Sequence, residues 1–172
     1  FFTLVLTGLA TDTWARTTVV DSLEGPETSW ELGDSDAEVE IQHHARVRRP
    51  VHSGSWSEEF RLFCAGGSFA YAETKIDPAA VIDELTYSVW IRGNRPGFQL
   101  SARVVLPRSI DPESGNALTM KIYGDSYQDV GRWQQVFIHH IMKQVRRQAR
   151  ILQSGQLARI DTREAYIDRI II

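Results

Sequence analysis

The chain has 172 residues, of which 42% are hydrophobic and 24% are charged, with a formal net charge of −3. This length suits one domain with a hydrophobic core rather than two ordinary domains, and the composition is that of a globular protein. The small net charge gives no reason to expect nucleic acid or another polyanion as a partner. Because Cys64 is the one cysteine, an internal disulfide is excluded.

The chain opens with the apolar run FFTLVLTGLA. A bilayer span takes about 20 apolar residues, so this run is too short to cross a membrane, and it resembles the apolar part of a secretory signal peptide. We therefore predict that residues 1–16 are a truncated signal peptide and that one domain covers residues 17–172. The protein would then be secreted or lie in the cell envelope or periplasm. The alternative is that the run is the first β-strand of the fold.

Short stretches of alternating apolar and polar residues fill the middle of the chain, with Gly, Pro, Asn and Asp between them. Such a pattern, with turns at short intervals, predicts an all-β protein with an antiparallel β-sandwich. The last stretch has no closing turn or polar tail, so we expect that the domain lacks its last strand and is a fragment of a longer protein. The predicted strands cover 57–64, 85–92, 98–106, 118–123, 133–138 and 165–172.

One segment, 138–153, has helical spacing. Ile141, Val145 and Leu152 fall on one side, and Lys143 and Arg147 fall on the other. This predicts an amphipathic helix near the C-terminus that packs across the end of the sandwich, with a membrane-surface helix as the alternative. Residues 139–172 carry seven basic and three acidic residues, whereas 21–40 carry eight acidic and no basic residues. Packing of the two segments or a solvated surface explains this asymmetry better than a nucleic-acid site.

Five segments resemble, in order, the landmarks of the family-4/9-type carbohydrate-binding modules, which share the galactose-binding-like jelly roll. They are DSLEG at 21–25 followed by Trp30, VHSGSW at 51–56, YSVWIR at 87–92, GRWQQV at 131–136 and YID at 166–168. The resemblance implies a non-catalytic accessory module of a secreted, polysaccharide-acting protein, with a glycoside hydrolase domain beyond residue 172. It also implies a structural Ca²⁺ held in part by the carboxylate of Glu24. The loop 107–115 and the helix look like additions to the family pattern.

Sugar recognition needs flat aromatic faces and planar polar side chains. If the strands at 85–92, 98–106 and 118–123 share a sheet, their polar sides form one face that could bind a poly- or oligosaccharide. Its three cations would favour an acidic or sulfated glycan. The alternative is that Trp90 packs under the helix or on a neighbouring domain, which would make the sandwich a docking module for a following catalytic domain. The predicted ligand-binding residues are Trp90, Arg92, Gln99, Arg103, Lys121 and Tyr123.

A second candidate site is the loop with Asp125, Tyr127 and Gln128, for which a turn-forming role is the stronger alternative. No nucleophile, phosphate-binding or zinc-binding motif occurs in the sequence. Adjacent pairs such as Glu58 and Glu59 diverge in a strand, so nothing selects two cooperating carboxylates. We therefore predict no catalytic residue, no enzyme activity and no membrane span for this chain.

Overall fold

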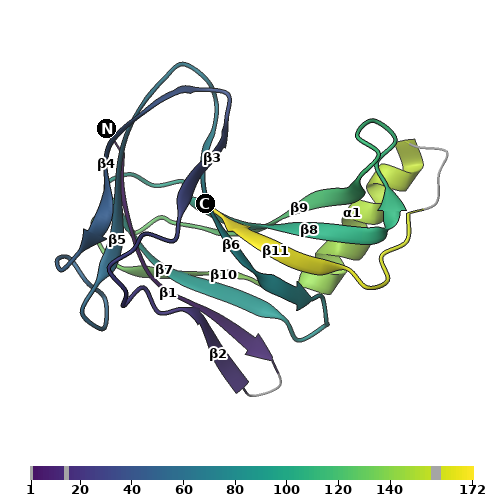
Figure 1. Cartoon of the computed structure of the whole chain (residues 1–172), viewed down its shortest axis with the longest axis horizontal. Helices are drawn as coiled ribbons and strands as arrows, with labels where there is room; N and C mark the ends of the chain where they lie inside the picture. Colours follow the sequence, from purple (N-terminus) through teal and green to yellow (C-terminus); the bar gives the residue numbers. More distant parts are fainter. Residues whose placement is uncertain (1, 14–15, 156–159) are drawn as a thin grey trace.

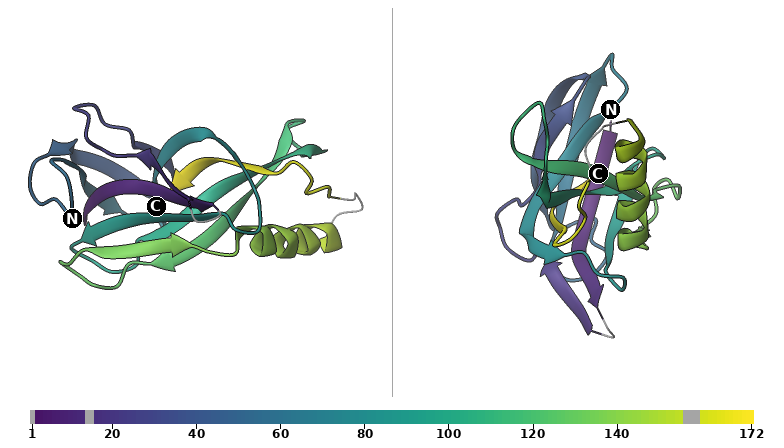
Figure 2. Two further views of the ribbon diagram at one scale, coloured as in Figure 1. Left: turned by 90° about the horizontal axis from the view of Figure 1, so that it is seen from below. Right: turned by 90° about the vertical axis from the view of Figure 1, so that its right-hand side faces the viewer.

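Two antiparallel sheets packed face to face, with one helix at an end, make up the fold (Figures 1 and 2). The computed structural model describes residues 2–13, 16–155 and 160–172, and within residues 1–20 it describes only the side chain of Leu4. The predicted all-β sandwich with a single helix near the C-terminus is confirmed.

Sheet A has the strand order β10-β7-β1-β5-β4, with β2 paired to β1. Sheet B has the order β3-β6-β11-β8-β9. The strands of sheet A are β1 (Phe2–Thr13), β2 (Arg16–Asp21), β4 (Glu38–Val47), β5 (Ser57–Ala65), β7 (Thr86–Gly93) and β10 (Gln134–Ile138). Those of sheet B are β3 (Glu31–Ser35), β6 (Ala70–Ala80), β8 (Gln99–Ile110), β9 (Ala117–Ser126) and β11 (Tyr166–Ile171).

Strand β1 lies inside sheet A and pairs with β5 and β7. Of the segment 1–16, predicted as a truncated signal peptide, residues 2–13 therefore form a strand of the sheet in this structure. The alternative interpretation, a first β-strand, describes their conformation in the fold. The sequence could not decide between the two, because a short apolar run is typical of a buried strand as well as of a signal peptide. Cleavage of this segment stays a prediction.

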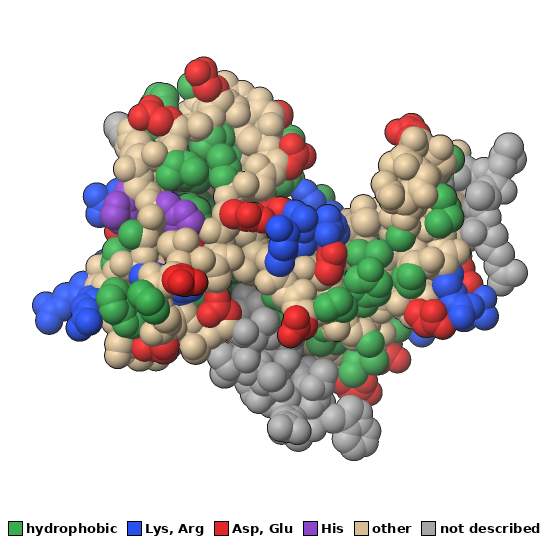
Figure 3. All heavy atoms as spheres, in the orientation of Figure 1, with side chains coloured by type: hydrophobic (Ala, Val, Ile, Leu, Met, Phe, Trp, Pro, Cys, Tyr) green, Lys and Arg blue, Asp and Glu red, His purple; other side chains and the backbone are tan. Residues whose placement is uncertain are grey.

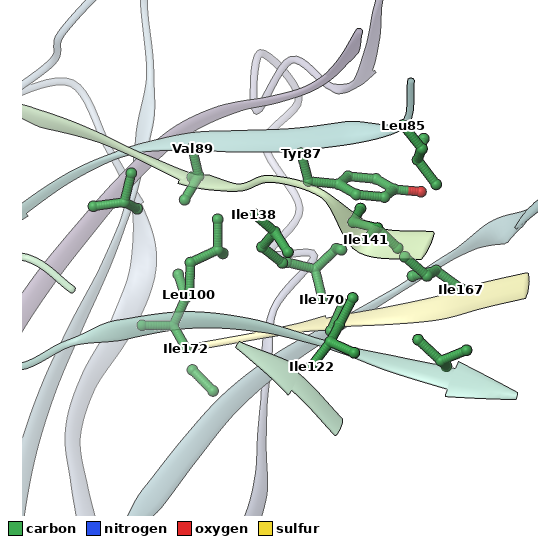
Figure 4. Close-up of a cluster of buried hydrophobic side chains, with 14 of the residues drawn as sticks. Leu85, Tyr87, Val89, Leu100, Ile122, Ile138, Ile141, Ile167, Ile170 and Ile172 are labelled. Carbon is green, nitrogen blue, oxygen red and sulfur yellow. The ribbon is translucent and has the colours of Figure 1, made fainter. Parts of the chain in front are cut away.

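The core lies between the two sheets, as the alternation of the central strands predicts. In β7, Tyr87, Val89 and Ile91 are buried, while Trp90 and Arg92 on the other side of the strand are only half-buried. In β8, Leu100 and Val104 face the same interior. Figure 4 shows Tyr87, Val89 and Leu100 together with inward side chains of β9, β10 and β11. Since successive strand residues point to opposite faces, Trp90 and Arg92 lie on the outer face of sheet A.

The helix α1 (Ile141–Gly155) begins three residues later than predicted. Its buried residues are Ile141, Val145 and Ala149, which lie on one side of the helix as the predicted amphipathic pattern requires. The helix lies at one end of the sandwich beside β9 (Figures 1 and 2). Among the described residues, no helix is both long enough and apolar enough to cross a membrane.

Strands β2, β3, β4 and β6 were not predicted, and β8 continues to Ile110, beyond its predicted end at residue 106. The predicted loop 107–115 is therefore strand in its first part. The extended end of β8 is held by Ser109, whose hydroxyl contacts the backbone of Asp161. The β8–β9 hairpin thus projects further than the alternating apolar pattern indicates.

Candidate functional site

The structure divides the predicted ligand-binding residues between the two sheets. Trp90 and Arg92 lie in β7 of sheet A, whereas Gln99 and Arg103 of β8 and Lys121 and Tyr123 of β9 lie in sheet B. The expectation that all of them share one face is wrong. The chain crosses from one sheet to the other between β7 and β8.

Backbone hydrogen bonds explain this crossing. The amide of Gly97 donates to the carbonyl of Tyr127 at 2.8 Å, and the amide of Tyr127 donates to the carbonyl of Phe98 at 2.7 Å. These bonds attach the start of β8 to the end of β9 instead of to β7. A strand that alternates apolar and polar residues has the same sequence pattern in either sheet of a sandwich. The pattern therefore could not show whether β8 and β9 join the sheet of β7 or the opposite sheet.

Trp90 belongs to an aromatic cluster on the outer face of sheet A. The imidazole of His52 stacks on the Trp90 indole, with ring centroids 3.7 Å apart and planes at 15°. Trp133 meets the same imidazole edge-on, at 5.7 Å between centroids. His52 is exposed, and the two tryptophans are half-buried. We refer to His52, Trp90 and Trp133 as the Trp90 cluster.

Planar polar side chains flank the Trp90 cluster. The Arg92 guanidinium donates from Nε to the carbonyl of Gly131 at 2.9 Å, which holds it beside the segment that carries Trp133. Gln135 pairs with Trp90 across the β10–β7 ladder, and its amide donates to the Ser88 hydroxyl at 3.1 Å. The cluster therefore joins three of the segments that resemble carbohydrate-binding modules, at 51–56, 87–92 and 131–136.

On the outer face of sheet B, the two predicted cations have intramolecular partners. Arg103 binds both carboxylate oxygens of Asp168, at 2.9 and 2.5 Å, and this hydrogen-bonded pairing raises the pKa of Arg103 above its usual value. The Lys121 ammonium lies 3.5 Å from the ring centroid of Tyr71, which in turn stacks on Phe69. Figure 3 shows basic and acidic side chains side by side over β6 and β11. The argument for an acidic glycan is weakened, because Arg103 and Lys121 are engaged and lie away from Trp90.

A pocket of about 490 Å³ lies where β11 ends, between β6 and β8. We call it the β11-end pocket. Of the predicted ligand-binding residues, Gln99 and Tyr123 line it, and Tyr123 is 47% exposed. Its other lining side chains are mainly apolar or aromatic and include Leu62, Cys64, Phe69, Tyr71, Phe98 and Ile172.

A buried polar cluster surrounds Glu58, whose side chain is fully buried. Its carboxylate accepts the backbone amides of Ser29 and Trp30, each at 3.1 Å. It also lies 2.6 Å from Nε2 of His44 and 3.3 Å from the Arg46 guanidinium. The cluster therefore fastens the segment before β3 to sheet A. Since Glu58 has no exposed surface for a substrate to reach, the arrangement is that of a structural ion pair.

The sequence offered no signal for this cluster beyond the presence of Glu58 itself. Its partners come from separate elements, with Arg46 and His44 in β4 and Ser29 in the loop before β3. Arg46 also donates to the carbonyl of Glu27 at 2.7 Å, while its Nη1 atom has no hydrogen-bond partner among the described residues. Only the register of β4 against β5, which pairs Arg46 with Glu58, reveals the contact.

Glu24, the predicted Ca²⁺ ligand, connects two loops. Both of its carboxylate oxygens lie 3.0 Å from the backbone amide of Ser55. Within the described ranges, no group of three or more His, Cys, Asp or Glu side chains is placed to hold a metal ion. Calcium at Glu24 stays a prediction, for which loop carbonyls would have to supply most ligands.

The second candidate loop contains a buried structural tyrosine. Tyr127 has no exposed surface, and its hydroxyl lies within 3.0 Å of the carbonyls of Gly93, Asp129 and Arg132. The buried side chain thus holds the backbone of this loop in place through its hydroxyl group. For Tyr127 the turn-forming alternative is confirmed.

No family model, curated protein or solved structure matches the chain. The family resemblance, the glycan ligand and the extracytoplasmic location therefore stay predictions.

Proposed function

We propose that the chain is a non-catalytic carbohydrate-binding module whose ligand, a poly- or oligosaccharide, binds the outer face of sheet A at the Trp90 cluster. The observation that carries the proposal is the convergence of His52, Trp90 and Trp133 beside Arg92 and Gln135. In line with the family resemblance, the module would be an accessory domain of a secreted glycoside hydrolase-like protein.

The chemistry of the cluster suits a sugar ring. The C–H side of a pyranose packs on aromatic faces, and its hydroxyls bond to planar donors and acceptors. His52 is exposed and contacts both indoles, so a sugar that binds the cluster would meet this imidazole at the surface. Arg92 and Gln135 are already oriented by their own hydrogen bonds, which lowers the entropic cost of using them for binding.

A glycan array, followed by titration calorimetry on the glycans that bind, tests this proposal. We expect Trp90→Ala and Trp133→Ala each to weaken binding by about tenfold or more, equivalent to about 1.4 kcal/mol. Two variants are matched controls: Arg103→Ala on the outer face of sheet B, and Trp56→Ala, which removes a tryptophan paired with Arg48 outside the cluster. Both should bind as the unmodified chain does.

Near-ultraviolet circular dichroism of each variant shows whether its fold is intact. A folded chain that binds no glycan on the array contradicts the proposal. So does binding that survives Trp133→Ala in a folded variant, because the cluster would then not be the site.

A further inference from the structure

We propose that the outer face of helix α1 binds an acidic polysaccharide, one whose sulfate or carboxylate groups repeat along the chain. This surface is separate from the Trp90 cluster, and it adds the charge of the ligand to the proposed function. The choice of a glycan as the ligand rests on that function, because α1 follows β10, the strand that begins next to Trp133 and carries Gln135.

Four cations form one stripe along α1, and all four are exposed. Their spacing is i, i+3, i+4 and i+7, which places them on one side of the helix over a length of about 10 Å. The side chains that α1 buries, Ile141, Val145 and Ala149, lie on the opposite side. We refer to the four cations, Lys143, Arg146, Arg147 and Arg150, as the basic face of α1.

No carboxylate neutralises the basic face within the described part of the chain. Helix α1 contains no acidic residue, and none of the ion pairs among the described residues includes one of its side chains. The arginines of sheet B differ, since Arg103 meets Asp168 and Arg169 meets Glu73. The acidic segment 21–40 lies at β3 and the start of β4, away from α1 (Figure 1). The four positive charges are therefore available to an external anion.

The basic face lowers the stability of the helix that carries it. Like charges four residues apart repel each other, and α1 has two such pairs, Lys143 with Arg147 and Arg146 with Arg150. Lys143 also lies in the first turn, where the positive end of the helix dipole disfavours a cation. The Nε atom of Arg150 donates to the carbonyl of Arg146 at 3.2 Å, a bond that neutralises neither charge. A local feature that opposes the fold is typical of a functional site, which favours a binding role for these charges.

The chemistry of the basic face suits a chain that bears oxyanions. Three of its four residues are arginines, whose planar guanidinium groups donate two parallel hydrogen bonds to a carboxylate or to a tetrahedral oxyanion. Because the cations follow one line along the helix, they match a ligand whose charged groups also repeat along a line. A sulfated or carboxylated polysaccharide has this form.

A membrane surface and a nucleic acid fit less well. A helix that lies on a membrane inserts its apolar side among the lipids, whereas the apolar side of α1 is part of the core of the sandwich. Single-stranded nucleic acids stack on aromatic side chains, and α1 contains none. The net charge of −3 also opposes binding of a ligand with very high charge density.

Titration calorimetry with heparin, which is sulfated, and with polygalacturonate, which is carboxylated, tests the proposal. The helix variant combines Arg146→Gln, Arg147→Gln and Arg150→Gln, because glutamine has a helix propensity similar to that of arginine. At about 50 mM salt, we expect this variant to bind whichever polysaccharide the chain binds about tenfold more weakly or worse, with a smaller dependence of Kd on salt.

The matched control replaces three exposed cations that already meet carboxylates. It combines Lys75→Gln, Arg108→Gln and Arg163→Gln. The control has the same net charge as the helix variant and should bind as the unmodified chain does. Equal weakening in the helix variant and in the control would show that only net charge matters, and it would overturn the proposal.

Thermal unfolding separates a binding role from a structural one. Because the substitutions in the helix variant remove like-charge repulsion, this variant should unfold at the same temperature as the unmodified chain or at a higher one. A lower unfolding temperature would show that the cations support the fold, and it would overturn the proposal.

Other outcomes also overturn the proposal: binding of neither polysaccharide, or tighter helix-dependent binding of duplex DNA or of vesicles that contain phosphatidylserine. The proposed function and this inference fail separately. Binding that Trp133→Ala abolishes and the helix variant retains refutes the basic face alone. Binding that the helix variant loses and Trp133→Ala retains supports the basic face, even where the array refutes the Trp90 cluster.

Discussion

The imidazole of His52 lies parallel to the indole of Trp90, with 3.7 Å between the ring centroids. This contact joins the loop between β4 and β5 to the middle of β7, two segments that are far apart in the sequence. The stack fixes the loop over the outer face of sheet A and covers one face of the tryptophan. It therefore supports both the stability of the loop and the proposed binding surface.

His52→Ala should lower the free energy of unfolding by about 0.5–1.5 kcal/mol, because aromatic pairs contribute about this much beyond the area that they bury. Urea denaturation measures the effect. Ser53→Ala, at an exposed neighbouring position, is the control and should stay within about 0.5 kcal/mol of the unmodified chain. Equal effects of the two substitutions would show that the stack contributes nothing specific.

Glu58→Gln should destabilise the fold by about 1.5–3 kcal/mol. The substitution removes the fully buried counter-charge of Arg46, whose side chain is 4% exposed, and leaves it only the Asp21 carboxylate at 3.8 Å among the described carboxylates. Chemical denaturation is the measurement, and Glu84→Gln, at an exposed position, is the matched control with almost no effect. A loss below about 1 kcal/mol for Glu58→Gln would contradict a buried ion pair at this position.

Gly67→Ala should cost more than Gly66→Ala, although both glycines have positive φ angles, 69° and 63°. A left-handed backbone costs an alanine about 1–2 kcal/mol at either site. At Gly67 the added Cβ would also lie 2.5 Å from the backbone Cα of Ala37, whereas nothing lies within 4 Å at Gly66. We expect an additional loss of about 1–3 kcal/mol from this clash. Thermal unfolding of the two variants compares them directly, and equal midpoints would refute the close approach.

Asp36 should make stability depend on pH in the acidic range. Its carboxylate accepts hydrogen bonds from the Ser68 hydroxyl, at 2.6 Å, and from the backbone amides of Ser68 and Phe69. These bonds lower the pKa of Asp36, and the bond from the Ser68 hydroxyl has the largest effect. Because the folded-state pKa lies below the unfolded value of about 3.9, the stabilisation is fully present above that value. It is lost as the pH falls through the lower folded-state pKa.

Asp36→Asn removes this ionisation. The difference in unfolding midpoint between the unmodified chain and Asp36→Asn should therefore be largest above about pH 5 and should shrink toward about pH 2. Thermal denaturation across this range measures it. A constant difference at every pH would show that the carboxylate charge does not contribute.

The strands that could be predicted are those with a simple two-residue alternation, such as β7, with Tyr87 and Val89 inward and Trp90 outward. Strand β6 was missed because Pro78 argues against a central strand. In the structure, Pro78 lies at a register shift between β6 and β11. Ile167 pairs with Ala79 and Arg169 pairs with Lys75, so residues 76–78 lie opposite the single residue Asp168 and the regular ladder is interrupted there. Strand β4 was missed because its charged residues and the bulge between Ile41 and His43 break the alternation.

The candidate site was only partly predictable for a related reason. The sequence indicates that Trp90 and Tyr123 point away from the core, since both follow from local alternation. Which sheet each strand joins depends on tertiary hydrogen bonds such as those of Tyr127, and no local pattern encodes them. His52 and Trp133 were noted only as parts of a family resemblance, and their contact with Trp90 needed the folded chain.

The position of β11 has a consequence for the order of folding. Among the described strands, β11, formed by residues 166–171, is the one that joins β6 to β8 in sheet B. Until these residues leave the ribosome, the β3–β6 pair and the β8–β9 pair have no common partner strand. Closure of sheet B must therefore wait until the ten strands that precede β11 in the described part of the chain have been synthesised. Long sequence separations between paired strands slow folding, so docking of β11 is the step at which the nascent chain is most exposed to competing associations.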